Sequence, residues 1–530
     1  MSAETADLLS LAEPAAEAPQ PPRPAPGTAP LGPELVDRIL AGGGRDAEDG
    51  AGPVVALLAE PRTAEALVLW FGRPRAAELL RDRRALLAAL DRDIARIDAL
   101  LSTQLDTILH APRLQQLEAG WRGVAYLVEA ASGTAAVKVR ILDIGWDEVC
   151  RDLQRAIEFD QSHLFQKIYE QEFGTPGGEP YGLLIGAYEL RHKPGPDHPT
   201  DDVAGLKGMA QIAAAAFAPF VAGAHPTLLG VESFAELGQP IDILQGVRGA
   251  DFVRWQGLRD LEDSRFLGLT APRVLMRPPW PDDGSRTDGF RYREDTSAPD
   301  LSGYCWGPAA FAFGGILIRA FDDSGWFAEI RGAAVGGNSG GLVTDLPSLS
   351  FGTDREGVGY RIATDVELTD AAEKDISDLG IIALCRGRDT PHAVFHGNPS
   401  LQRPKTYDRQ VATANARLSA MLQYIFCISR FAHYVKVIGR ERVGTFLSAE
   451  DCQEFLRRWL LSYSISSDTA TGEQRARYPL REVDVTVREL PGRPGMYGCV
   501  IHLRPHFQLD QVASSFRLVT ELTAPGARAA

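Results

Sequence analysis

Apolar residues recur every three or four positions along one stretch in the N-terminal third of the chain. The series is Leu87, Leu90, Ile94, Ile97, Leu101, Leu105 and Ile108. This spacing predicts a helix of roughly seven turns with an apolar stripe along one side. Its polar side carries charged residues, namely Arg92, Asp93, Arg96 and Asp98. A stripe of this length has to be buried, and packing within its own domain and packing against another chain are both open.

A second amphipathic helix is expected directly after the first. Pro112 suits its first helical position, because the N–H that proline lacks has no partner there. The apolar residues that we expect to face the core are Leu114, Leu117, Trp121, Val124 and Val128.

The middle of the chain alternates between strand and helix patterns. Residues 137–144 alternate like a half-buried strand, and a helix is expected over 147–158. Residues 181–190 are typical of a buried strand, and 202–217 of an amphipathic helix. This order of elements predicts a mixed α/β core.

The C-terminal third predicts helices followed by a small antiparallel sheet. A helix is expected over 409–437, and Ser448 with Asp451 three residues later approximates a capping box for the next one. Strand-like segments then end the chain, at 483–487, 497–507 and 514–522. The predicted fold class is therefore α/β (mixed α+β), with long N-terminal helices, a mixed core and this C-terminal sheet.

The N-terminus differs in composition from the rest. Residues 1–53 are rich in Ala and Pro and lack aromatic residues, so they cannot bury enough apolar surface to offset chain entropy, and we expect disorder. Five segments follow from these patterns: 1–60 disordered, 61–135 helical, 136–405 mixed α/β, 406–522 C-terminal helices and sheet, and 523–530 a disordered tail.

Charge and hydropathy exclude two classes of partner. The 530 residues carry a formal net charge of −15, which argues against broad contact with nucleic acid phosphates. No segment is expected to span a bilayer, since the longest apolar stretch, 208–224, is interrupted by Pro219. Glu4 and Asp7 stand where a signal peptide needs positive charge, so we expect a cytoplasmic protein.

Candidate chemistry is sparse. The segment around Ser339, GNSGG, fits the G-x-S-x-G pattern of serine hydrolases, but the sequence after it contains Pro347 and predicts no helix there. His192, Asp197 and His198 lie in a Pro-rich loop, which favours a surface turn over a metal site. The six cysteines are scattered singly, and no P-loop motif is present. We therefore expect no catalytic, cofactor-binding or metal-binding residues, with a hydrolase using Ser339 as the alternative from another class.

Several long motifs resemble the large sheath subunit of the bacterial type VI secretion system, the TssC or VipB family. Two of them read EFGTPGGEPYGLLIGAYEL (172–190) and LEDSRFLGLTAPR (261–273). The others lie at 94–110, 114–128, 326–332, 412–438 and 504–509, in the order of the family.

The resemblance implies a structural role and a set of partners. Family members pair with a small sheath subunit, and the heterodimers polymerise with further copies around an inner tube of ring-forming protein. The sheath assembles on a baseplate, its contraction drives effector export, and an AAA+ ATPase dismantles it.

Three sets of residues are assigned to these contacts as hypotheses. The small-subunit interface is Leu87, Leu90, Ile94, Ile97, Leu101 and Leu105, and the inter-subunit linking strand is Phe516, Arg517, Leu518 and Val519. Leu8 and Leu9 are the weaker candidates for docking the ATPase. A divergent paralogue that acts as an assembly or baseplate-proximal factor is the alternative within the same family.

Overall fold

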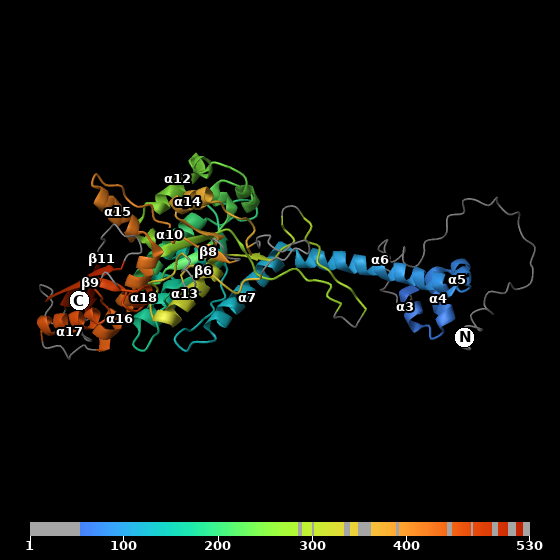
Figure 1. The fold of residues 1–530 in the computed structure, drawn as a ribbon, viewed down its shortest axis with the longest axis horizontal. Coiled ribbons are helices and arrows are strands. Elements are labelled where there is room, and N and C mark those ends of the chain that lie inside the picture. The colour runs from blue at the N-terminus through green and yellow to red at the C-terminus, as the bar shows by residue number, and fades with distance from the viewer. Residues whose placement is uncertain are drawn as a thin grey trace, which may run out of the picture. The chain divides into compact units, whose positions relative to one another are not determined.

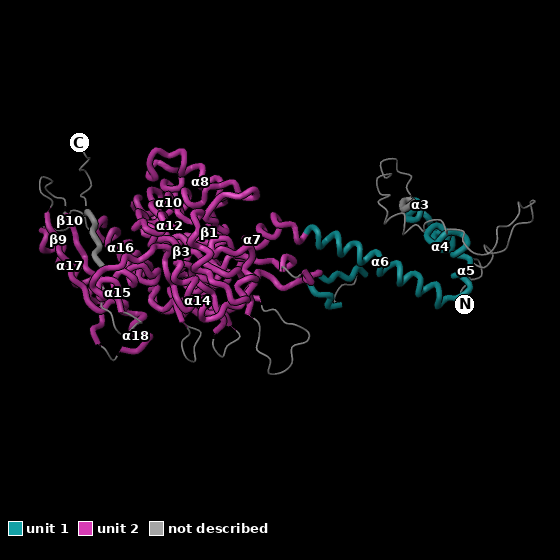
Figure 2. Tube along the Cα trace, turned by 90° about the horizontal axis from the view of Figure 1, so that it is seen from above, with its two compact units in different colours: residues 1–108, 280–294 teal, residues 109–279, 295–530 magenta. Residues whose placement is uncertain are grey.

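In the computed structural model, the chain begins with helices, continues into a mixed sheet and ends in a second sheet (Figure 1). The structure describes residues 53–284, 289–298, 301–332, 340–347, 362–387, 392–441, 448–467, 470–489, 497–506 and 516–522. These residues confirm a mixed α/β fold. They form two units, Met1–Ile108 with Trp280–Glu294, and Leu109–Pro279 with Asp295–Ala530 (Figure 2).

The first unit is helical and has a small core of its own. Its helices are α3 (Pro53–Ala59), α4 (Thr63–Phe71), α5 (Arg73–Leu79) and α6 (Arg83–Leu109). Phe71, Ala76 and Ala89 are buried together, which joins α4 and α5 to the start of α6. The indole N–H of Trp70 donates a 2.8 Å hydrogen bond to buried Asp93 of α6. Asp93 therefore belongs to this core, and the prediction that it lies on the polar side of α6 is wrong.

A segment distant in sequence completes this unit. Residues 280–294 lie against the C-terminal half of α6, where the Tyr292 hydroxyl donates a 2.7 Å hydrogen bond to Asp106. Two hydrogen bonds link Trp280 and Glu294 at the ends of the segment.

The second unit is built on a six-stranded sheet in the order β1-β2-β3-β7-β8-β6. Its strands are β1 (Leu184–Leu190), β2 (Phe220–Ala224), β3 (Leu267–Ala271), β7 (Ile381–Arg386), β8 (Ala393–Phe395) and β6 (Leu342–Val343). The first four are parallel, and β8 and β6 pair antiparallel at one end. The two inner strands β2 and β3 are buried along their whole length, as expected when helices cover a parallel sheet on both sides.

Alternate residues of these strands enter two different cores. Ile381 and Ala383 pack with α10 (Asp202–Ala216) and α8 (Trp146–Arg155) on one face of the sheet. Ile382 and Leu384 pack with α13 (Ala310–Ser324) and α7 (Pro112–Ala131) on the other face. The two-residue period of the strands thus accounts for the helix–sheet–helix layers.

Shorter elements connect these layers. The helical ones are η2 (Phe159–Gln161), α9 (His163–Phe165), the π-helix η3 (Gln166–Gly174), η4 (Pro226–Leu229), η5 (Phe234–Gly238), α11 (Ile243–Gly246), η6 (Ala250–Phe252), α12 (Val253–Arg259), η7 (Glu262–Phe266) and α14 (Asp370–Asp378). The strands β4 (Val274–Leu275) and β5 (Trp306–Gly307) form a two-stranded sheet.

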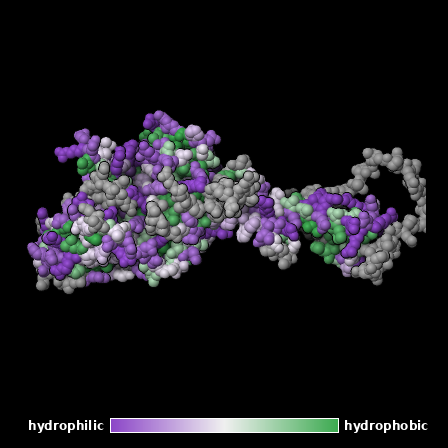
Figure 3. All heavy atoms as spheres, viewed as in Figure 1, coloured by the Kyte–Doolittle hydropathy of each residue, from purple (hydrophilic) through white to green (hydrophobic). Residues whose placement is uncertain are grey.

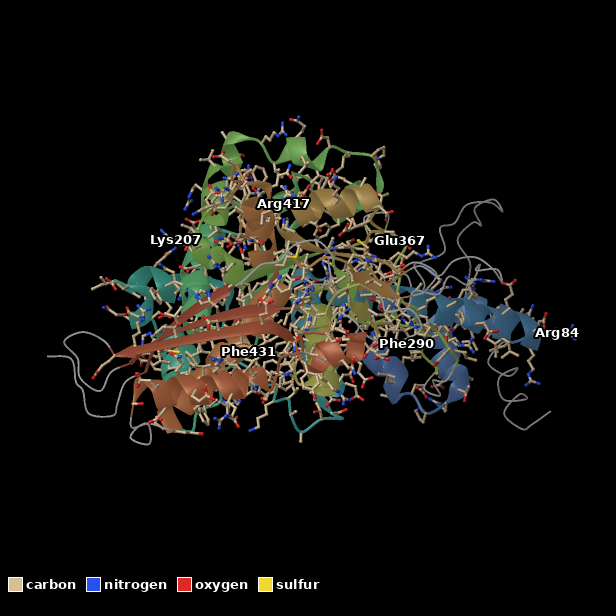
Figure 4. All side chains as sticks on the ribbon, turned by 60° about the vertical axis from the view of Figure 1, so that its left-hand side comes forward. Arg84, Lys207, Phe290, Glu367, Arg417 and Phe431 are labelled. Atoms are coloured by element: carbon tan, nitrogen blue, oxygen red, sulfur yellow. The ribbon has the colours of Figure 1, made fainter. Side chains whose placement is uncertain are left out.

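A third core lies under the C-terminal sheet. The helices here are α15 (Gln410–Ser419), α16 (Leu422–Glu441), α17 (Ala449–Leu461) and α18 (Gly472–Arg477), and the strands are β9 (Leu480–Glu489), β10 (Tyr497–Pro505) and β11 (Phe516–Leu522). Phe431 of α16, labelled in Figure 4, is fully buried. Its ring stacks on Trp326 with 4.2 Å between ring centroids. The Ser448 hydroxyl accepts a hydrogen bond from the Asp451 N–H, which confirms the predicted cap of α17.

Two sequence predictions about this unit are wrong in detail. Residues 137–144 form no strand, because no described strand pairs with them; Lys138 and Arg140 instead form ion pairs with Glu172 and Glu179. The helix expected over 409–437 is two helices, because the chain turns between Ser419 and Leu422.

Candidate functional site

A row of exposed apolar side chains runs along α6. Leu87, Ile94, Leu101 and Ile108 are spaced seven residues apart and are 48%, 52%, 44% and 59% exposed. We call these four residues the α6 row. A seven-residue apolar repeat over several turns is typical of a helix that packs against another helix in a coiled coil.

The remaining residues of the predicted stripe lie closer to their own chain. Leu90 packs on the core of the first unit, and Ile97 and Leu105 are half-buried. The structure therefore brings all six predicted interface residues onto one helix but divides them into two rows. Only part of the stripe is used within the unit, which leaves Leu87, Ile94 and Leu101 available to another chain.

Hydrophobic and hydrophilic atoms alternate on the surface of this helical unit. Green patches lie directly beside purple ones there (Figure 3). The charged residues Asp91 and Arg92 are exposed next to the α6 row. An apolar row flanked by charged residues is the usual composition of a helix that binds one partner helix in a defined register.

A second exposed apolar row lies on α7, and sequence reasoning assigned it to the core. Leu117, Trp121 and Val128 are exposed, whereas Ala119 and Gly123 of the same helix are buried. The small residues face α13: a Cβ placed on Gly123 would lie 2.4 Å from the ring of Phe311. Three of the five residues predicted for the core face of α7 are therefore wrong, whereas Val124 packs against the core as predicted. Ala119 and Gly123, four residues apart, were the sequence signal for the true core face, because small residues allow two helices to approach closely.

The C-terminal strand pairs within its own chain. β11 is antiparallel to β10, with Phe516 opposite Leu503 and Leu518 opposite Ile501. The strand order β11-β10-β9 places β11 at an edge, so within the described residues its outer backbone edge has no strand partner. The predicted linking residues, which also include Arg517 and Val519, are thus in an edge strand.

The other predicted residues lie partly outside the described part of the chain. Leu8, Leu9 and Ser339 lie outside the described residues. His198 lies 2.7 Å from Asp202, whereas buried His192 stacks on Phe252 at 4.0 Å. Within the ranges that the structure describes, no three His, Cys, Asp or Glu side chains are arranged to hold a metal ion.

The thiols are in environments that suppress their reactivity. All six cysteines are buried and free. Burial raises the pKa of Cys427 to about 12, and burial together with nearby acidic residues raises the pKa of Cys150 to about 12 as well. A thiol must lose its proton to act as a nucleophile, so these side chains serve as packing residues.

No helix in the described part of the chain has both the length and the hydropathy that a membrane span requires.

The comparisons with known proteins define the class as a two-part tail sheath protein. The family model "EvpB/VC_A0108, tail sheath N-terminal domain" matches residues 91–402, and "EvpB/VC_A0108, tail sheath gpW/gp25-like domain" matches residues 411–522. The type VI secretion system sheath protein TssC1 of Pseudomonas aeruginosa is 39% identical over 441 residues, which cover 82% of this chain and 86% of that protein. The chain therefore belongs to the type VI secretion sheath large-subunit family, and it is a structural sheath protein.

The matched ranges correspond to parts of the fold. The first match contains most of α6 and the six-stranded sheet, and the second contains the C-terminal helices and the three-stranded sheet. The α6 row begins just before the first matched range, at Leu87, and continues inside it.

Proposed function

We propose that this chain is the bulk large subunit of a type VI secretion contractile sheath. It forms a heterodimer with the small sheath subunit, and the heterodimers polymerise into a cytoplasmic sheath around the inner tube. The baseplate, the inner tube ring protein and the disassembly AAA+ ATPase complete the proposed set of partners. Membership of the sheath family supports this role, and the finer contacts are inferred from the surfaces described above.

The main support for the proposed heterodimer is the α6 row. Four large apolar side chains at heptad spacing are exposed on a helix of 27 residues. Burying each of them on association removes apolar surface from water, at about 25 cal/mol per Å². The small subunit would supply a helix that packs its own apolar seam against Leu87, Ile94 and Leu101.

The charge beside the row restricts this partner helix further. Asp91 and Asp98 occupy the same position in successive heptads, four residues after Leu87 and Ile94. Residues at that position face the flank of a partner helix in a coiled coil. The small-subunit helix is therefore expected to carry Lys or Arg at the facing positions.

The proposed link between heterodimers is the outer edge of β11. An unpaired edge strand is a template for pairing with another chain. Main-chain hydrogen bonds from a neighbouring subunit's strand would hold two heterodimers together while their domains rotate during contraction. Because β11 already pairs with β10, we expect its outer edge, rather than the whole strand, to make this link.

The test is co-expression with the small sheath subunit, followed by negative-stain electron microscopy. We expect tubules from the pair and aggregation of the large subunit alone, because its α6 row then has no partner. A large subunit that stays monomeric by itself and forms no tubules with the small subunit would contradict the proposal. A complex that forms without tubules would favour the paralogue as an assembly or baseplate-proximal factor.

A further inference from the structure

A cavity of about 160 Å³ lies in the C-terminal part of the second unit, beside α18. Its polar lining is Glu329, Gln423, Arg475 and His506, and Pro479 and Pro505 form part of its apolar wall. A cavity of this volume holds one medium-sized side chain or several water molecules. A second cavity of about 30 Å³ is also lined by Glu329, which places this carboxylate between the two.

Gln423 contributes an acceptor that has no partner. Its side chain is 4% exposed, and Oε1 makes no hydrogen bond among the described residues. A buried polar atom without a hydrogen bond costs free energy, so native structures satisfy nearly all of them. Gln423 lines the cavity, so a donor placed in the cavity could pair with this oxygen.

Glu329 is a second acceptor at the same cavity. Burial, with Asp323 and Glu473 nearby, raises the pKa of this half-buried carboxyl group. Within the described residues, no lysine or arginine forms an ion pair with it. The carboxylate faces Gly472, since a Cβ placed on that glycine would lie 3.2 Å from Oε1. A cation that arrived here would relieve the repulsion among three acidic groups.

Arg475 and His506 also line the cavity. Arg475 is close enough to His506 to lower the pKa of that imidazole, together with burial, which contributes most. The cavity lining therefore combines a carboxyl group, a guanidinium, an imidazole and apolar residues.

We propose that this cavity receives an arginine side chain from another protein subunit of the assembly. The aliphatic stem lies against Pro479 and Pro505, and the guanidinium donates to the Glu329 carboxylate and to Gln423 Oε1. Arginine fits better than lysine, because its planar fork presents five donors and can serve two acceptors at once. This inference rests on the proposed function in one respect: the protein that supplies the arginine is taken to be another sheath subunit.

The test uses Nα-acetyl-arginine amide and the matched neutral probe Nα-acetyl-citrulline amide. Saturation-transfer NMR on the large subunit co-purified with its small partner should detect weak, roughly millimolar binding of the arginine probe and none of the citrulline probe. Glu329→Gln should weaken the binding of the arginine probe by about 10-fold or more, as expected for the loss of a charge-assisted hydrogen bond. Glu454→Gln, an exposed acid that pairs with Arg458 on α17, is the matched control and should change nothing.

A second measurement connects the cavity to assembly. Glu329→Gln should leave the heterodimer intact and reduce the length or yield of tubules. Equal binding of the two probes, no binding of either, or binding unaffected by Glu329→Gln would overturn the inference, whatever the tubules show. Probe binding by a wild-type complex that forms no tubules would instead contradict the proposed sheath function and leave the arginine site standing.

Discussion

Helices α6 and α16 are both long and rich in apolar residues, yet they bury them very differently. In α6 the buried residues are Ala89 and Asp93, while large apolar side chains such as Ile94 and Ile108 are exposed. In α16 the apolar residues are buried on several sides, with Phe426 and Phe431 at 1% and 0% exposure. The difference indicates that α16 stabilises this chain, whereas α6 buries only part of its stripe here and leaves the rest exposed, where we propose that another chain binds.

The largest effect is expected in the core that α16 forms. Phe431→Ala removes a fully buried ring that stacks on Trp326 and should lower the free energy of unfolding by about 3–5 kcal/mol. Urea unfolding of the co-purified heterodimer, followed by tryptophan fluorescence, measures the change. A shift under about 1 kcal/mol would show that α16 is less important to the core than its burial indicates.

A smaller effect is expected where α6 packs on its own unit. Trp70→Phe removes the donor to Asp93 and leaves a buried carboxylate short of one hydrogen bond, at a cost of about 1–3 kcal/mol. The first turns of α6 should then exchange their amide hydrogens roughly 10- to 100-fold faster. Exchange beyond Ile108 should stay unchanged, and uniform acceleration along the chain would contradict a local core.

The pH dependence of stability tests the burial of α16 in another way. Burial lowers the pKa of His433 to about 4 in the folded chain, and its Nε2 lies 2.9 Å from the Ala216 carbonyl oxygen. At this position the unfolded state therefore binds more protons between pH 6.5 and 4, so the contribution of His433 to stability falls as the pH decreases through this window and is constant above it. His433→Gln, which can still donate to that carbonyl, should show a shallower fall in the urea midpoint between pH 7 and pH 5. An unchanged slope would mean that other groups set the acid sensitivity.

The smallest effect on stability is expected at the α6 row itself. Leu101→Ala truncates an exposed side chain on a helix and should change the free energy of unfolding of the large subunit alone by less than about 0.5 kcal/mol. Refolded large subunit in mild urea, kept dilute to prevent association, provides the measurement. A loss of 2 kcal/mol or more would place Leu101 in the core of its own unit.

Local patterns were sufficient to predict most of the helices and strands but not their environments. The apolar stripe that begins at Leu87 predicted the helix α6. It did not show which residues of the stripe are buried, because exposed and core-facing apolar residues recur with the same period. Strict alternation at Val483, Val485 and Val487 predicted β9, whereas the same alternation at 137–144 met no partner strand. Pairing depends on where distant segments lie, and local sequence does not carry that information.

Side-chain size explains the error on α7 and the missed segment at 280–294. Trp121 is the largest apolar residue of α7, so hydrophobicity assigned it to the core, but the close contact with α13 needs the small residues Ala119 and Gly123. The hydrogen bond from Tyr292 to Asp106 joins residues far apart in sequence, and no periodicity indicates it. The Tyr292–Asp106 contact is non-local packing that periodicity cannot reveal, whereas the small residues of α7 were a local signal that hydrophobicity outweighed.

The most direct test of the account is a pull-down of the small sheath subunit by variants of α6. Ile94→Asp with Leu101→Asp places two charges in the α6 row and should abolish co-purification, while the helical content of the large subunit is retained. Ala95→Asp with Ala99→Asp adds the same charges at exposed positions outside the row and should leave co-purification at the wild-type level. Full recovery of the small subunit with the first variant would contradict the claim that the α6 row binds it.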